Sequence, residues 1–333
     1  MIWKNIQLHN VAATELREDG AIYLRRFPLS CHEEFAVSPY EIVPLAGRLT
    51  TGCELRFVGD SADIYLSAEE FDGTVEIFRG DYFCRVERLQ AGVIKKIELR
   101  ETPIDTINPP PSGRFSSNVW RIIFDHDLQV VLHDVQSETG VRPPLAEELP
   151  SKKMIAYGSS ITHSACAQLF TNSYIYTVAK KLGVDVLCKG MGGSCLIHDS
   201  VVEYLPREEW DIAILELGIN MVDLFPVEVF EERVRGFIPK MLACGKPVVL
   251  ISNFFSFRCL ETDSLYQVNA DYVSTLEKLY KEFKTENLYY INGEDILTDW
   301  DYLTSDLIHP SPYGHGEMGR KIAKIIHEEF KIL

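Results

Sequence analysis

The sequence predicts two regions of different fold class: an all-β sandwich or jelly roll over residues 1–135, and a doubly wound α/β domain over residues 154–333. Three observations predict this division. A chain of 333 residues exceeds a typical single small domain. Short alternating runs fill its first part, and continuous apolar runs fill its second part. The stretch between them, residues 136–153, carries three prolines and no apolar stripe, so it is the expected linker.

Short strand-like runs with turn residues between them characterise the first region. The earlier runs are close to alternating and the last two are more continuously apolar, as buried strands can be. Many short strands separated by turns indicate a sandwich or jelly roll, and no helix is expected here. The expected strands are 54–58, 62–66, 74–78, 94–99, 120–124 and 128–132.

Continuous apolar runs that alternate with helical patterns characterise the second region. Such runs fit strands that are buried on both faces of a parallel sheet. Apolar residues at spacings of three and four predict one helix over 265–283, and a similar pattern predicts the last over 318–330. The result is a five-stranded, flavodoxin-like parallel sheet, which binds ligands at the carboxyl ends of its strands. The expected strands are 154–157, 184–188, 212–215, 247–251 and 288–291.

Composition narrows the possible partners and cofactors. A net charge of −16 argues against nucleic acid and anionic membrane surfaces, because phosphates would be repelled. The first residues lack a signal-peptide core and no run is long enough to cross a bilayer, so a cytoplasmic location is expected. The eight cysteines are scattered and are expected to be reduced. No C-x-x-C or H-E-x-x-H pairing is present, so neither a metal nor an organic cofactor is expected.

Chemically useful side chains follow three of the predicted strands. Ser160 follows the first, a glycine-rich run over 189–194 follows the second, and Asn220 follows the third. Asp306 and His309 come after the fifth strand and can form a carboxylate–imidazole pair. Since the carboxyl ends of parallel strands meet at one edge, a hydroxyl, its base and oxyanion donors are expected on one rim.

These residues resemble the motifs of the SGNH (GDSL-type) hydrolase family, and the resemblance covers most of residues 154–330. The first block, G-D-S, matches Gly158-Ser159-Ser160, and the fifth, D-x-x-H, matches Asp306 to His309. The resemblance implies that Ser160 is the nucleophile, His309 the general base and Asp306 the residue that orients it.

The same resemblance implies an oxyanion hole. Its donors would be the Ser160 N–H, the N–H of a glycine in the second block and the side-chain amide of Asn220. The glycine matches Gly193 best, with Gly192 and Gly190 as neighbouring alternatives.

The chain departs from the family pattern at three positions. Ser159 and Met221 replace the usual aspartates, and Cys188 stands where many members have asparagine. None of the three is expected to take part in the chemistry. A β-sandwich before such a domain is similar to carbohydrate esterase family 2.

A second Gly-Asp-Ser tripeptide, Gly59-Asp60-Ser61, is interpreted as a turn between two strands rather than as a nucleophile motif. Asp125-His126-Asp127 is likewise expected to be a turn, and His133 a residue of the sandwich.

Other histidines and aromatic residues stay outside the predicted catalytic set. His163 is either a substrate contact or an exposed residue at a helix start, His315 is expected at a helix start, and His198 is not assigned. Aromatic residues near the strand ends can stack on a sugar ring or serve packing, which is the commoner role. They are Phe254, Phe255, Phe257, Trp300 and Tyr302.

The residues and the resemblance together predict a serine esterase that hydrolyses small acyl esters, with acetyl as the first candidate, on a carbohydrate. The same site permits an acyltransferase, and the sandwich permits a non-catalytic carbohydrate-binding protein. The expected partner is a small-molecule or glycan ester, with no nucleic acid and no membrane, and no oligomeric state is predicted.

Overall fold

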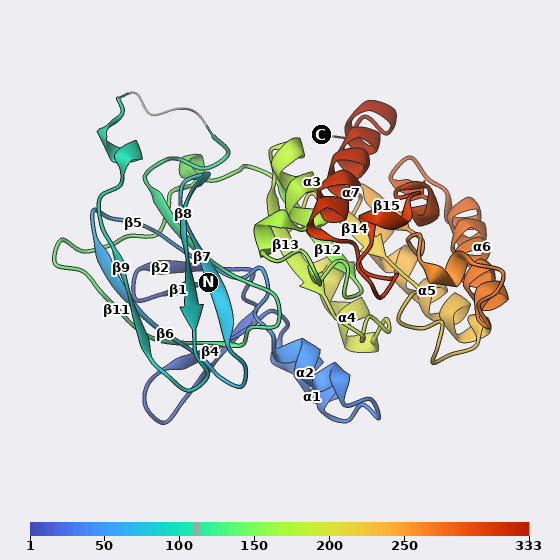
Figure 1. The fold of residues 1–333 in the computed structure, drawn as a ribbon, viewed down its shortest axis with the longest axis horizontal. Coiled ribbons are helices and arrows are strands. Elements are labelled where there is room, and N and C mark those ends of the chain that lie inside the picture. Colours follow the sequence, from blue (N-terminus) through green and yellow to red (C-terminus); the bar gives the residue numbers. More distant parts are fainter. Residues whose placement is uncertain (109–112, 333) are drawn as a thin grey trace.

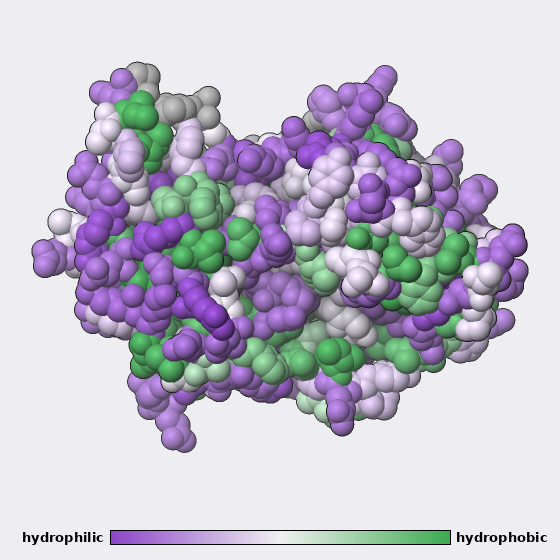
Figure 2. All heavy atoms as spheres, in the orientation of Figure 1, coloured by the Kyte–Doolittle hydropathy of each residue, from purple (hydrophilic) through white to green (hydrophobic). Residues whose placement is uncertain are grey.

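The computed structural model describes residues 1–108 and 113–332. A sandwich of two antiparallel sheets lies beside a five-stranded parallel sheet that is covered by helices (Figure 1). Both predicted fold classes are therefore confirmed. Hydrophilic side chains cover most of the sandwich face seen in Figure 2.

The sandwich encloses a core of residues such as Leu55, Leu66 and Trp120, which are fully buried between its two sheets. In spatial order, the six-stranded sheet contains β1 (Ile2–Trp3), β2 (Ile6–His9), β5 (Glu54–Val58), β10 (Val119–Phe124), β7 (Gly73–Arg79) and β8 (Tyr82–Leu89). The five-stranded sheet contains β3 (Ala13–Leu16), β4 (Ile22–Arg25), β11 (Val130–Gln136), β6 (Ala62–Ala68) and β9 (Lys95–Leu99).

Two helices interrupt the strands of this region, so the expectation of no helix was wrong. They are α1 (Leu29–Ala36) and α2 (Ile42–Arg48). Both are shorter than the length at which an isolated helix is stable, so tertiary packing must hold them. Phe35 packs so closely on Gly47 that a Cβ there would lie 2.5 Å from the Phe35 ring. Their buried residues belong to a core on one face of the parallel sheet.

The parallel sheet has the strand order β13-β12-β14-β15-β16. Its strands are β12 (Lys153–Gly158), β13 (Asp185–Gly190), β14 (Ile212–Glu216), β15 (Val248–Ile251) and β16 (Leu288–Ile291), which agrees with the five predicted runs. The helices are α3 (Tyr174–Leu182), α4 (Asp199–Tyr204), α5 (Val227–Leu242), α6 (Tyr266–Phe283) and α7 (Pro312–Lys324). Residues of α4, α5 and α6 pack on one face, together with α1 and α2, and residues of α3 and α7 pack on the other.

The sandwich covers the open edge of this sheet. Strand β13 is an edge strand, and unpaired carbonyl groups along such an edge need donors. His9 Nε2 lies 2.8 Å from Val186 O, and Asn10 Nδ2 donates to Cys188 O at 3.0 Å. Arg26 donates to Gly190 O at 2.7 Å. Side chains of the sandwich thus replace the missing neighbouring strand at every second residue of β13.

Buried charges cross the same interface. Arg56 of β5 makes a bidentate contact with Asp185, the first residue of β13, at 2.6 and 2.8 Å. At another point of this interface, the Asp125 carboxylate of the predicted turn accepts a hydrogen bond from Phe170 N.

Among the described residues, every helix is too short or too polar to cross a membrane.

Candidate active site

Ser160 and His309 meet at the carboxyl ends of the strands. Ser160 lies in the turn that follows β12, and His309 lies just before α7. Ser160 Oγ is 2.8 Å from His309 Nε2, and His309 Nδ1 is 2.7 Å from Asp306 Oδ2. Because a carboxylate accepts, His309 Nδ1 carries the proton, and Nε2 is left as the acceptor for the serine hydroxyl. This is the geometry of a nucleophile, a base and an orienting carboxylate.

Asp306 is held by more than the imidazole. Its Oδ1 accepts from Thr304 Oγ1 at 2.9 Å, from Ile308 N at 2.8 Å and from His309 N at 2.9 Å. The turn needs Leu307 in the left-handed region, at φ 57°. Partial burial acts to raise the pKa of Asp306, but the hydrogen bonds from His309 and its neighbours outweigh burial and hold the pKa below its usual range. The carboxylate is therefore charged at neutral pH.

Asn220 presents its amide nitrogen rather than its oxygen. Its Oδ1 accepts a hydrogen bond from Cys195 N at 3.1 Å, and a backbone N–H can only donate. The amide Nδ2 of this half-buried residue has no partner among the described residues. The structure thus leaves an amide donor free beside the glycine-rich loop.

The three candidate glycines occupy different positions. A Cβ at Gly190 would lie 2.4 Å from His163 N, so this glycine packs tightly against the backbone of the loop after β12. A Cβ at Gly192 would lie 3.8 Å from Ser160 Cβ, whereas one at Gly193 would meet Ile42 of α2 at 3.3 Å. The side of Gly192 on which a side chain would stand therefore faces Ser160, and the corresponding side of Gly193 faces α2.

The residues that depart from the family motifs are accommodated below the site. Ser159 Oγ accepts from Ile161 N at 3.1 Å, and Ser159 N donates to Glu216 Oε2 at 2.6 Å. Met221 and Cys188 are fully buried, and Cys188 Sγ donates to Thr162 O at 3.6 Å. Burial raises the pKa of Glu216 to about 7. A buried acid at the end of β14 therefore supports the backbone just before Ser160.

His163 is buried, with 1% of its surface exposed, so of its two predicted roles the exposed residue at a helix start was wrong. Its Nε2 lies 3.3 Å from Arg26 Nη2. Its ring centroid lies 4.8 Å from that of His126, with the two planes tilted by 58°, so the predicted turn at residues 125–127 contacts this loop. His315 lies in the first turn of α7, as expected. His198 immediately precedes α4 and packs on Phe35.

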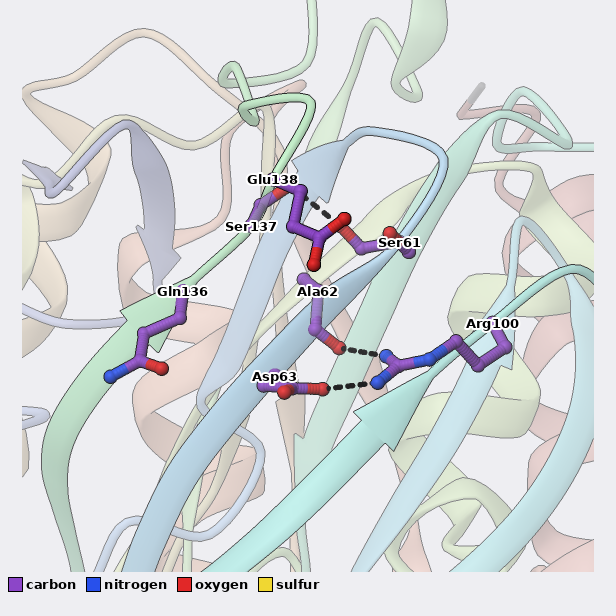
Figure 3. A pocket seen from close by; sticks show the side chains of 7 residues that line it. All are labelled: Ser61, Ala62, Asp63, Arg100, Gln136, Ser137 and Glu138. Carbon is purple, nitrogen blue, oxygen red and sulfur yellow. Dashed lines mark hydrogen bonds and ion pairs between the residues drawn. The ribbon is translucent and has the colours of Figure 1, made fainter.

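The second Gly-Asp-Ser tripeptide lies in the sandwich. Ser61 connects β5 to β6 and lines a polar pocket of about 350 Å³ (Figure 3). Ser137 Oγ donates to Ser61 O at 2.7 Å, and Arg100 pairs with Asp63. No histidine is among the residues that line this pocket, so Ser61 has no base there.

Groups of side chains with metal-ligating atoms occur among the described residues, and each already has a competing partner. The groups are His126, Asp127 and His163; Cys166, Asp306 and His309; and His9, Glu54 and Asp185. In the first group, Arg26 donates to His163. In the second, Ser160 Oγ is hydrogen-bonded to His309 Nε2. In the third, Arg56 forms ion pairs with Glu54 and Asp185. None of them favours a metal centre.

A hydroxyl, an imidazole and a carboxylate in series, at the carboxyl edge of a parallel sheet, define the serine-hydrolase class of α/β proteins. The model of the GDSL-like lipase/acylhydrolase family matches residues 151–327. The chain therefore belongs to this family.

Solved structures with the same two-part architecture are similar to the whole chain. The salicylyl-acyltransferase SsfX3 from a tetracycline biosynthetic pathway has a TM-score of 0.79 at 16% identity, over 96% of this chain and 93% of its own. A putative GDSL-like lipase from Bacteroides ovatus has a TM-score of 0.70 at 17% identity, over 99% and 97%. A family two carbohydrate esterase from Cellvibrio japonicus has a TM-score of 0.66 at 15% identity, over 99% and 96%. The comparison with curated proteins gave no match.

Proposed function

We propose that this protein is a serine esterase that hydrolyses small acyl esters, acetyl esters first among them, through an acyl-enzyme. The observation that carries the proposal is the 2.8 Å contact between Ser160 Oγ and His309 Nε2, with Asp306 on the other ring nitrogen. A hydroxyl is a weak nucleophile until a base takes its proton, and this contact supplies the base.

In the proposed reaction, Ser160 Oγ attacks the ester carbonyl while its proton moves to His309 Nε2. The negative charge on the carbonyl oxygen is stabilised by the Ser160 N–H, the Asn220 amide and one glycine N–H. For this glycine we propose Gly193, the best match to the family motif, with Gly192 and Gly190 as the alternatives. His309 then gives its proton to the leaving alcohol, and a water that it activates releases the acid.

The nucleophile is tested by covalent labelling with an organophosphonate and by turnover of p-nitrophenyl acetate. Ser160→Ala is expected to abolish both, because no other hydroxyl contacts His309 among the described residues. Ser61→Ala, in the second Gly-Asp-Ser, is the matched control and should keep the parent's rate. Labelling of the Ser160→Ala variant at the parent's rate would show that the assignment is wrong.

A carbohydrate is the proposed alcohol. The support is architectural: the chain shares its two-part fold with family two carbohydrate esterases, one of which, from Clostridium thermocellum, was solved in complex with cellohexaose. A screen of acetylated sugars against p-nitrophenyl esters of increasing chain length tests it. Faster release of acetate from the sugars than from simple esters is expected, and the reverse order would contradict a sugar ester as substrate.

Acyl transfer is a second candidate, supported by the similarity to the salicylyl-acyltransferase, whose TM-score is 0.79. The same acyl-enzyme serves both reactions, and only the acceptor differs. Product analysis with and without an added alcohol separates them. A new ester that accumulates with the alcohol would indicate transfer, and release of free acid at an unchanged rate would indicate hydrolysis.

A further inference from the structure

Arg26 is a buried cation at the junction of the sandwich and the parallel sheet. It follows β4 directly and none of its surface is exposed. Its guanidinium donates to Leu49 O at 2.7 Å and to Ala46 O at 2.9 Å, both at the C-terminal end of α2. It also donates to Gly190 O at 2.7 Å and to Cys188 O at 3.3 Å. One side chain therefore joins the sandwich to the end of β13.

The fifth contact of this guanidinium reaches the loop that carries Ser160. Arg26 Nη2 lies 3.3 Å from His163 Nε2, and because arginine only donates, His163 Nε2 is the acceptor. In the neutral ring the proton is then on Nδ1, which faces Gly192: a Cβ on that glycine would lie 3.3 Å from it. Burial, assisted by the charge of Arg26, keeps the pKa of His163 well below its usual value, which agrees with a neutral ring.

Arg26 differs from the other large buried arginines in its partners. Arg56 and Arg121 are equally buried, and each pairs with a carboxylate within 2.7 Å. Arg26 forms no ion pair with the described residues, and its acceptors are four backbone carbonyls and one imidazole. Burying a cation without a counter-ion is unfavourable, and a planar fork of donors suits several fixed acceptors at once. The requirement at position 26 is therefore the planar guanidinium, which can donate to five fixed acceptors at once, and not the positive charge alone.

Lys189 contributes to the same junction from the opposite direction. This fully buried residue of β13 donates through Nζ to the Arg26 backbone oxygen at 2.6 Å. Arg26 thus donates to the carbonyl groups of Cys188 and Gly190 and accepts from Lys189. These residues come directly before Gly192 and Gly193, whose N–H groups are candidate oxyanion donors. A shift of Arg26 would move that strand end.

We propose that Arg26 is a positioning residue of the oxyanion hole, through which the sandwich fixes the glycine-rich loop and the His163 ring behind Gly192. The inference rests on the proposed esterase function and deepens it. It assigns the N-terminal region a part in the chemistry although none of its side chains need touch the reacting atoms.

The test compares Arg26→Lys with Arg56→Lys in the full-length protein, using p-nitrophenyl acetate. Both substitutions keep the charge, remove the fork and alter the same domain interface, but Arg56 contacts the opposite end of β13, at Asp185. Arg26→Lys is expected to lower kcat about tenfold or more with KM within about threefold, because small displacements of catalytic donors are costly. Arg56→Lys should keep kcat within about twofold.

Activity is expressed per active site, counted by phosphonate titration, at a temperature where circular dichroism shows both variants folded. A variant that is merely partly unfolded then shows fewer sites with a normal kcat per site. Equal kcat per site in Arg26→Lys and the parent, or equal losses in Arg26→Lys and Arg56→Lys, would overturn the inference. A parent that hydrolyses no ester would instead contradict the proposed function.

A pair of substitutions at His163 provides an independent readout. Glutamine places an oxygen near the position of Nε2 and can still accept from Arg26, whereas leucine cannot. We expect kcat per site to be at least about fivefold higher in His163→Gln than in His163→Leu. Equal values in the two variants would show that the contact with Arg26 has no part in positioning the loop.

Discussion

The backbone N–H of Cys195 donates to the side-chain oxygen of Asn220 at 3.1 Å, and this contact leaves the amide nitrogen of Asn220 without a partner among the described residues. It joins the loop after β13 to the loop after β14, the two loops that carry the glycine and the asparagine proposed as oxyanion donors. The amide nitrogen can then donate to a substrate without first rotating, and such preorganised donors are the most effective in catalysis.

Two substitutions of Asn220 distinguish the role of its amide nitrogen, as a donor to substrate, from the role of its oxygen, as the acceptor for Cys195 N. Asn220→Ala should lower kcat about a hundredfold or more, because one oxyanion donor is lost. Asn220→Asp keeps an acceptor for Cys195 N but replaces the donor with a negative charge, so it should be the slower of the two. Steady-state kinetics with p-nitrophenyl acetate measure both, and an Asp variant faster than the Ala variant would contradict the donor role.

Asp306→Asn is expected to lower kcat roughly 10³- to 10⁴-fold, because an amide nitrogen facing His309 Nδ1 would favour the wrong tautomer. The amide oxygen can still accept the bonds from Thr304, Ile308 and His309 N that hold the turn. The melting temperature should therefore change little. A large loss of stability with a modest loss of kcat would mean that Asp306 serves the turn rather than the imidazole.

Glu216 should make the stability of the protein depend on pH. Burial raises its pKa from 4.5 to about 7, so the folded state binds the proton more tightly than the unfolded state does. The stability that this proton confers is fully present below pH 4.5 and is lost as the pH rises through about 7. The shift corresponds to about 3 kcal/mol of unfolding free energy.

The experiment compares the melting temperatures of Glu216→Gln and the parent between pH 5 and pH 8. A glutamine oxygen can still accept from Ser159 N and Thr162 Oγ1, and it does not titrate. The stability of the variant relative to the parent should therefore increase with pH across this range. A difference that stays constant from pH 5 to pH 8 would contradict the assignment.

Asn10→Gly tests how the sandwich covers the edge of β13. Asn10 has φ 57°, a left-handed conformation that glycine adopts without strain, so the substitution removes only the side chain. Cys188 O and Gly52 O then lose a donor. The expected loss is about 1–3 kcal/mol of unfolding free energy, measured by denaturant titration. An unchanged midpoint would show that these buried carbonyls do not depend on the Asn10 side chain.

The strands of the parallel sheet were predictable because each of them is a continuous apolar run. Ile212–Glu216, for example, is buried at every residue, and such a run is visible in the sequence without knowledge of its neighbours. The short helices α1 and α2 were not predictable in this way. They form because Phe35 and Val43 are buried against the core of the parallel sheet, more than a hundred residues away in sequence.

Sequence alone placed Ser160, Asn220, Asp306 and His309 after strands of one parallel sheet, and since such strand ends share an edge, it predicted their common rim. The resemblance assigned the oxyanion glycine to Gly193, with Gly192 and Gly190 as alternatives, because the direction in which each glycine N–H points is fixed only in the folded loop. Sequence alone also missed Arg26, whose acceptors Gly190 and His163 lie 164 and 137 residues away. Local periodicity records which residues are buried, whereas the partner of a buried donor is fixed only when distant segments pack together.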